Sequence, residues 1–209
     1  MQTLETLPDD DSFDDVLFSR LDLQGQDIGP REFTGCTFRN CKAQELRLRN
    51  CRFEECTFEG CDLTRMRPQG MRALSIQFRN CKLMGVEFSD LGQFPRLGFD
   101  ECTLQFASFV ALSMRKTTFV GCRITEANFF EVDLSESTFP ACDLAQSVFR
   151  DCKLRKADFS QAKGLFLDPA VNEAREAIVP LETAALLAMH HGMRVSGFGE
   201  AATSRPRRQ

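Results

Sequence analysis

The sequence predicts an all-β protein, a four-sided parallel β-helix with about 20 residues in each coil. Mostly apolar residues recur every five positions between Phe13 and Phe159. This period fits neither a helix nor a simple strand, and a fixed internal period is typical of solenoids. In addition, every fourth of these residues falls into a column of one residue type. One column is phenylalanine throughout: Phe18, Phe38, Phe58, Phe78, Phe99, Phe119, Phe139 and Phe159.

Two positions in each five-residue unit are expected to face inward. We call the residue that marks the period central, and the residue two before it small. Between Phe33 and Phe159 no central or small residue is charged, in a chain that is 27% charged. Burying an unpaired charge is very costly, and residues two apart share one side of an extended backbone. The other three positions of each unit are therefore expected to face outward.

These units resemble the consensus of the pentapeptide-repeat family, A(D/N)LXX. Good matches are Ala157–Gln161 (ADFSQ), Ala127–Glu131 (ANFFE) and Cys142–Gln146 (CDLAQ). The resemblance covers roughly residues 11–163. It implies a right-handed quadrilateral β-helix, closed by a C-terminal helix that caps the solenoid and dimerises.

The N-terminal part divides into a lead segment and the first coils. Residues 1–12 form an acidic lead that we expect to be loose, and its charge discourages another strand from adding to the open end. The β-helix is predicted over residues 13–163. Its weakest stretch has the short residues Pro68 and Ala73 at central positions. The residues at the neighbouring small positions are larger and compensate for the lost volume. Because Pro68 has no N–H, the strand pairing there should be disturbed.

The period is broken once, since six residues rather than five separate Phe88 from the next central residue, Phe94. The segment 89–96 (SDLGQFPR) is expected to form a kink or a bulged corner. Insertions in repeat proteins are often functional loops, so Asp90 and Leu91 are candidate partner-binding residues. A simple correction of register is the alternative.

Gly164 is predicted to end the repeat, and residues 164–198 to form a cap and dimerisation module. A helix should begin after Pro180, because proline is favoured in a first helical turn, and end near Gly192. The segment Ile178–Leu187 resembles the C-terminal helix through which topoisomerase-protecting pentapeptide proteins dimerise. Residues 199–209 should be a disordered basic tail. The candidate dimer contacts are Leu181, Ala185, Leu186, Leu187, Met189 and Val195.

All ten cysteines occupy small positions. There they are expected to fill the wall as small apolar residues, rather than to bind zinc or form disulfides. Reduced thiols indicate a cytoplasmic protein. We find no signal peptide and no apolar run long enough to span a membrane.

No catalytic, cofactor-binding or metal-binding motif is found, and His190 and His191 are expected to make surface or dimer contacts. The protein is therefore predicted not to be an enzyme, and its function should lie on its outer surface. Charges there come in blocks: net −7 over residues 1–32, +5 over 33–86, −5 over 87–145 and +3 over 146–165. Many alternate in sign down a column, as in Asp22, Lys42, Asp62 and Lys82, which stabilises neighbouring strands.

Two groups of outward residues are left unexplained by this alternation. One is acidic: Glu126, Glu131, Asp133, Glu136 and Asp143. The other is apolar, with Val110 and Phe130 in one column and Phe106 on the adjoining side, and such a patch suggests a contact surface.

The resemblance to gyrase-protecting members implies a DNA mimic that binds DNA gyrase or topoisomerase IV and protects it from a poison. Acidic strips could compete for a DNA-binding saddle, where phosphate contacts supply much of the affinity. No direct binding of nucleic acid is expected. The alternative is an interaction module that binds an unrelated protein through the patch around Val110 and Phe130.

Overall fold

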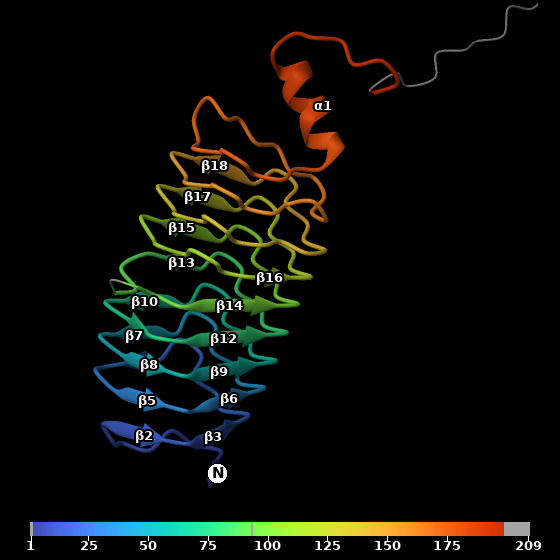
Figure 1. Cartoon of the computed structure of the whole chain (residues 1–209). Coiled ribbons are helices and arrows are strands. Elements are labelled where there is room, and N and C mark those ends of the chain that lie inside the picture. The colour runs from blue at the N-terminus through green and yellow to red at the C-terminus, as the bar shows by residue number, and fades with distance from the viewer. Residues whose placement is uncertain (1, 93, 199–209) are drawn as a thin grey trace, which may run out of the picture.

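The computed structural model describes residues 2–92 and 94–198. It is a parallel β-solenoid whose coils stack on four sides, followed by one helix, α1 (Leu181–His190), above the last coil (Figure 1). The predicted four-sided solenoid is confirmed. We number the sides 1 to 4 in the order in which the chain visits them, starting from the column of Phe18.

Side 1 is a seven-stranded parallel sheet. Its strands, in spatial order, are β1 (Gln2–Leu4), β3 (Val16–Ser19), β6 (Thr37–Arg39), β9 (Cys56–Glu59), β12 (Ile76–Arg79), β14 (Leu97–Asp100) and β16 (Phe119–Val120). The predicted phenylalanine column lies inside this side. Successive rings stack with centroids 4.5 to 5.4 Å apart, a favourable offset geometry for aromatic pairs.

Side 2 is a ladder of single β-bridges. Its members are the outward residues that precede each central residue: Asp22, Lys42, Asp62, Lys82, Thr103, Arg123, Asp143 and Lys163. The predicted alternation of charge is present, and the amine of Lys82 lies 3.6 Å from the carboxylate of Asp62. Such exposed pairs contribute little individually.

Side 3 consists of two sheets, one above the other. The lower sheet is β4 (Asp27–Ile28), β7 (Arg47–Arg49) and β10 (Arg67–Gln69), and the upper is β13 (Glu87–Phe88), β15 (Ser108–Val110), β17 (Asn128–Phe130) and β18 (Val148–Arg150). Elsewhere the main-chain N–H of a central residue donates to a carbonyl of the next coil, as the N–H of Leu63 does to the carbonyl of Lys82. Pro68 has no N–H, so the sheet divides directly above β10, as expected.

Side 4 carries β2 (Ser12–Asp14), β5 (Glu32–Thr34), β8 (Arg52–Glu54) and β11 (Arg72–Ala73). Above β11 this side is interrupted by the inserted residue. Higher coils continue through single bridges, such as Ser113 to Asp133 and Asp133 to Lys153.

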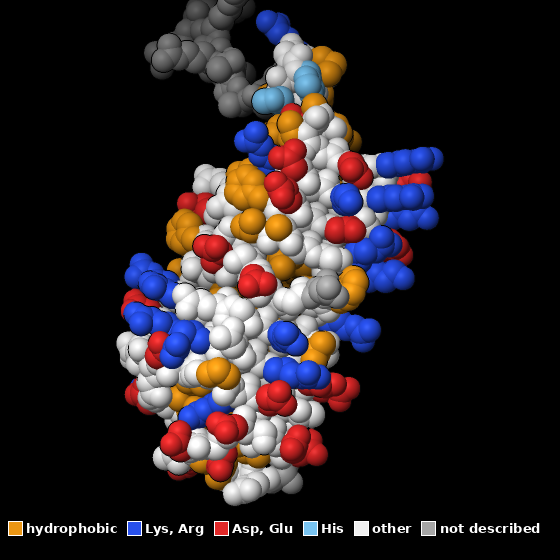
Figure 2. All heavy atoms as spheres, turned by 90° about the vertical axis from the view of Figure 1, so that its left-hand side faces the viewer, with side chains coloured by type: hydrophobic (Ala, Val, Ile, Leu, Met, Phe, Trp, Pro, Cys, Tyr) orange, Lys and Arg blue, Asp and Glu red, His pale blue; other side chains and the backbone are white. Residues whose placement is uncertain are grey.

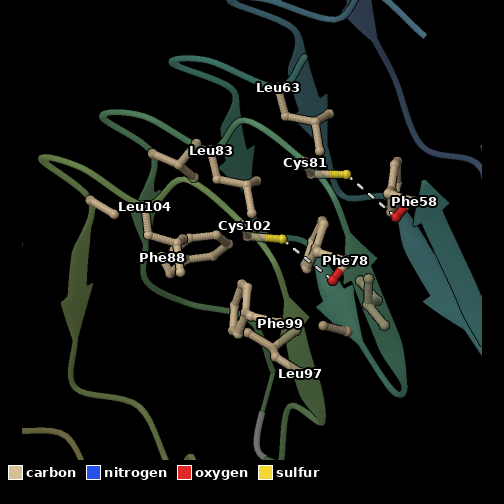
Figure 3. Close-up of a cluster of buried hydrophobic side chains, with 14 of the residues drawn as sticks. Phe58, Leu63, Phe78, Cys81, Leu83, Phe88, Leu97, Phe99, Cys102 and Leu104 are labelled. Carbon is tan, nitrogen blue, oxygen red and sulfur yellow. Dashed lines mark hydrogen bonds between the residues drawn. The ribbon is translucent and has the colours of Figure 1, made fainter. Parts of the chain in front are cut away.

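The cysteines, which all occupy small positions, face inward as predicted. All ten are buried and not in disulfides. Nine of the ten thiols, all but that of Cys122, donate to a main-chain carbonyl of the coil below, as Cys81 does to Phe58 and Cys102 to Phe78, both at 3.4 Å (Figure 3). A thiol in the wall therefore packs as an apolar group and also meets a carbonyl oxygen.

The inserted segment bulges outward as expected, but the period places Phe94 wrongly. Phe94, predicted to be central, is 76% exposed, whereas Leu91 is 1% exposed. The carbonyl of Leu91 accepts from the N–H of Ala73 at 3.1 Å, and Arg96 N–H donates to the Ala73 carbonyl at 3.2 Å. These two bonds hold both ends of the segment against β11. The extra length must bulge outward, and Phe94 moves out with it.

Both ends of the solenoid are more ordered than predicted. The lead segment is not loose, because β1 pairs with β3, and Leu4 and Leu7 pack against the core. The repeat also does not end at Gly164, since bridges join Lys153 to Glu173 and Asp158 to Ile178. One further coil therefore precedes α1.

Helix α1 is tied to this last coil by its inner face. The hydroxyl of Thr183 donates to the carbonyl of Leu165 at 3.0 Å, and Thr183 and Ala185 are buried. This confirms that one face of the helix caps the solenoid. The basic tail expected at residues 199–209 lies outside the described residues.

Candidate functional site

The upper part of side 3 brings the predicted apolar residues together. Val110, Phe130 and Arg150 are register partners on β15, β17 and β18. They follow a central residue, so their side chains point outward, and Val110 and Phe130 are half-buried. Val148, on the neighbouring column, is 46% exposed.

Acidic and aromatic residues lie at the two corners that border this surface. Phe106, which is 50% exposed, and Glu126 occupy the corner before side 3, and Glu131 the corner after it. All three have positive φ, near 55 to 60°, a conformation uncommon outside glycine. The Glu126 carboxylate accepts a hydrogen bond from the Gln105 amide at 3.1 Å.

We call Phe106, Val110, Glu126, Phe130, Glu131 and Val148 the side-3 patch. Figure 2 faces this side and shows hydrophobic side chains between acidic ones over the upper coils. The patch offers an apolar centre bordered by carboxylates. Such a surface suits contact with a partner that has apolar and basic groups.

The remaining acids of the predicted block lie on other sides. Asp133 lies on side 4 and Glu136 at the corner that follows it, where Arg115 lies 2.9 Å from Glu136 and 4.0 Å from Asp133. Asp143 lies on side 2, with Lys163 at 3.3 Å. The five acids therefore surround one coil instead of forming a single strip, and three of them are in ion pairs.

The two candidates in the inserted segment have different positions. Asp90 has a positive φ of 48° and follows β13 at the corner that Glu131 occupies two coils higher. Leu91 points into the core, so its side chain cannot contact a partner. Phe94 instead projects outward beside Leu74, which is 39% exposed. Sequence reasoning missed it because the fixed period placed it inside.

The predicted dimer residues are divided between the two faces of the terminal module. Leu181 is 85% and Met189 41% exposed, Ala185 is buried, and Leu186, Leu187 and Val195 are half-buried. Ile178 and Met193, which were not predicted, are 53% and 58% exposed. The sequence could have indicated Ile178, because it is an apolar residue directly before a central position, where side chains face outward.

The ring of His190 lies 5.2 Å from that of Phe166, between centroids, so it packs against the segment below α1. In residues 2–92 and 94–198, no three histidine, cysteine or acidic side chains are placed to hold a metal ion. The same part of the chain contains no helix long and apolar enough to cross a membrane.

Comparisons with known proteins agree with this architecture. The family model described as the pentapeptide repeat region matches residues 11–88 and 92–163. A trypsin-treated form of QnrB1, described as a plasmid-mediated fluoroquinolone resistance protein, is 20% identical with a TM-score of 0.57. That match covers 93% of this chain and 97% of that chain. Full-length QnrB1 is 19% identical with a TM-score of 0.51, covering 92% and 97%. No curated protein matches.

Proposed function

Because the chain belongs to the pentapeptide-repeat family, we propose that it binds a type II topoisomerase and protects that enzyme from a poison. The partner is DNA gyrase or topoisomerase IV, and the chain acts by binding without catalysis. The buried, reduced thiols and the nature of this partner support a cytoplasmic location.

The observation that carries the proposal is the end-to-end match to QnrB1, which is described as a fluoroquinolone resistance protein. The likeness covers nearly all of both chains, so the length of the solenoid and its terminal module correspond, not only the repeat. A protein that mimics a segment of duplex needs a rod of defined length, and this correspondence supports the same use of the rod.

We assign the contact with the topoisomerase to the side-3 patch and the neighbouring Asp90. Glu126 and Glu131 would meet basic groups of the DNA-binding surface, and Phe106 and Phe130 would supply apolar contact. The other acids are engaged with Arg115 and Lys163. Mimicry of DNA would therefore be confined to one side of the upper coils.

The functional unit is proposed to be a homodimer formed through the terminal module. Leu181, Met189 and Met193 give α1 and the following turn an apolar surface that faces away from the solenoid. Joining two copies end to end would roughly double the length of the rod. Figure 1 places α1 at the end of the stack, where such a contact would extend it.

A supercoiling assay tests the proposal directly. Gyrase and, separately, topoisomerase IV are inhibited with a fluoroquinolone, and the protein is added in increasing amounts. Restored activity is expected, with Phe130→Glu and Glu131→Arg weakening it at least tenfold. Val120→Glu, at an exposed position on side 1, is the control. The absence of any rescue of either enzyme at excess protein would contradict the proposal.

A second candidate function rests on the same apolar surface. Val110 and Phe130 stack in register beside Phe106, which would equally suit an unrelated protein partner. Affinity capture with wild-type protein and with Phe130→Glu distinguishes the two. Loss of a non-topoisomerase partner in the variant, with gyrase unaffected by either protein, would favour this alternative.

A further inference from the structure

The basic block of residues 33–86 contains two pairs of stacked arginines that the proposed function does not use. Arg47 and Arg67 are register partners on β7 and β10, on side 3. Arg52 and Arg72 are register partners on β8 and β11, on side 4. Neighbouring strands lie about 4.8 Å apart, so each pair places like charges side by side.

This arrangement opposes the rule followed by other columns. On side 2, Asp62 lies between Lys42 and Lys82, and on side 1 the guanidinium of Arg39 lies 2.9 Å from Glu59. Like charges directly opposite each other on paired strands are destabilising. The two arginine pairs therefore cost stability, which is expected where a surface serves binding.

Local acids neutralise the cluster only in part, since Asp27 and Glu32 are the register partners below Arg47 and Arg52. Within the described residues, Arg47, Arg67 and Arg72 form no ion pair, and Arg52 pairs only with Glu54 of its own strand, at 2.9 Å. Below Arg47, Asp27 is engaged by Arg49 at 2.6 Å. Above Arg67, Glu87 accepts a hydrogen bond from the hydroxyl of Ser89.

The two pairs lie on either side of one edge of the rod. Asn50 and Cys51 separate β7 from β8, and Gly70 and Met71 separate β10 from β11. The edge is therefore uncharged in these two coils, and Asp90 lies on it in the next coil up. Figure 2 faces the left-hand side of Figure 1, where β7, β8 and β10 lie, and shows Lys and Arg side chains gathered there. The result is a convex ridge with a positive row on each side.

We propose that this ridge, formed by Arg47, Arg52, Arg67 and Arg72, binds the phosphate backbone of duplex DNA. A convex edge with two positive rows fits a groove whose two walls are lined by phosphates, whereas a flat acidic protein surface would reach only one row. All four residues are arginine, whose planar guanidinium group can contact a phosphate through two hydrogen bonds. The inference does not rest on the topoisomerase proposal.

The test is the fluorescence anisotropy of a short labelled duplex titrated with the full chain at several salt concentrations. With four phosphates contacted, the slope of log K against log salt should be about −3.6. Affinity should therefore fall on the order of 100-fold between 50 and 200 mM salt. No topoisomerase is present, so failure here is distinct from failure of the proposed function.

Two double variants distinguish binding by the ridge from a general effect of net charge on affinity. Arg67→Glu combined with Arg72→Glu should weaken binding at least tenfold. It should leave the Tm unchanged or raise it, because each new carboxylate faces an arginine. Arg150→Glu combined with Arg155→Glu makes the same change in net charge on the same two sides, higher on the rod, and should alter affinity less than threefold.

Three results would overturn the inference. One is no binding of the duplex at low salt, and another is an equal loss of affinity in the control variant. The third is tighter binding of poly-glutamate than of the duplex, which would identify an acidic protein segment as the ligand.

Discussion

Individual residues carry much of the conformational cost of this fold, because most turns between sides use a left-handed backbone. Gly25, at a corner, and Gly164, at a central position of the last coil, have nearly the same positive φ, 65° and 68°. A side chain added at Gly25 would meet open space, whereas a Cβ at Gly164 would lie 2.8 Å from the Cα of Ala145. The two positions therefore separate backbone strain from steric contact.

We predict that Gly25→Ala costs about 1 kcal/mol of unfolding free energy, from backbone strain alone. Gly164→Ala should cost roughly 2 kcal/mol more, because the main chain of Ala145 cannot move aside freely. Urea denaturation of both variants measures the difference. Equal losses would mean that the last coil yields without cost.

Burial also raises the pKa of the Cys51 and Cys152 thiols. In the unfolded chain a thiol ionises near pH 8.5, while these folded thiols stay protonated to higher pH. Their contribution to stability is therefore intact below about pH 8.5 and is lost as pH rises from there toward the folded pKa.

We predict that the unfolding free energy falls between pH 8.5 and 10, by up to about 1.4 kcal/mol per pH unit for each such thiol. Cys51→Ala should lower stability at neutral pH by leaving a cavity, yet make the alkaline decline shallower. Urea titrations at four pH values test this. An unchanged slope in the variant would show that Cys51 does not ionise differently in the two states.

Among the elements, the inserted segment shows where a sequence period stops being sufficient. The inward columns followed from the absence of charge and from the phenylalanine repeat, and the burial of these residues confirmed them on all four sides. The period alone placed Gly92 and Phe94 inward, but both are exposed. The hydrogen bonds of Ala73 decide which residue enters the core, and main-chain bonds leave no mark in the side-chain pattern.

Leu91 and Phe94 give a matched test of this corrected register. Leu91→Ala should cost about 2 to 4 kcal/mol, as expected for a buried leucine. Phe94→Ala should change the unfolding free energy by less than about 0.5 kcal/mol, because its side chain is exposed. Thermal and urea unfolding of both variants provide the measurement. The opposite ranking would restore Phe94 to the core.

The extra coil before α1 was hidden for a similar reason. Three of its four central positions, Gly164, Pro169 and Ala174, give little apolar signal, and only the fourth, Val179, is a large apolar residue. The chain still pairs there through main-chain bonds, such as the N–H of Leu154 to the carbonyl of Glu173 at 2.9 Å. Asn172 fills the place of a small residue, and its amide donates to the carbonyl of Phe149 at 2.9 Å. A polar side chain can therefore occupy the wall if it is fully hydrogen-bonded.

Across the entire solenoid, charged residues that are close in the sequence do not form one charged surface. Each coil visits four sides, so neighbouring acids such as Glu131 and Glu136 point in different directions. Residues 20 apart share a surface instead. The apolar column of Val110 and Phe130 was found from the sequence because it was read with that spacing. The five acids of the acidic block were grouped because they are close in the sequence, and they therefore lie on different sides.

The surfaces at the two ends of the rod differ, and only the C-terminal end is suited to a contact between two copies. At the other end β1 covers side 1, and acidic residues surround the first coil. The terminal module instead exposes Leu181 and Met189. Because these side chains point away from the solenoid, replacing them should not disturb the cap, which depends on the buried Thr183 and Ala185.

We therefore predict that Leu181→Glu combined with Met189→Glu converts a dimer into a monomer, because it places two unpaired charges in an apolar contact. Light scattering after gel filtration measures the mass. Leu74→Glu combined with Val120→Glu, at exposed apolar positions on the coils, should leave the dimer intact. If the wild-type chain is monomeric at micromolar concentration, or if both double variants dissociate alike, the terminal module is not the dimer contact, and the doubled rod required by the topoisomerase proposal loses its basis.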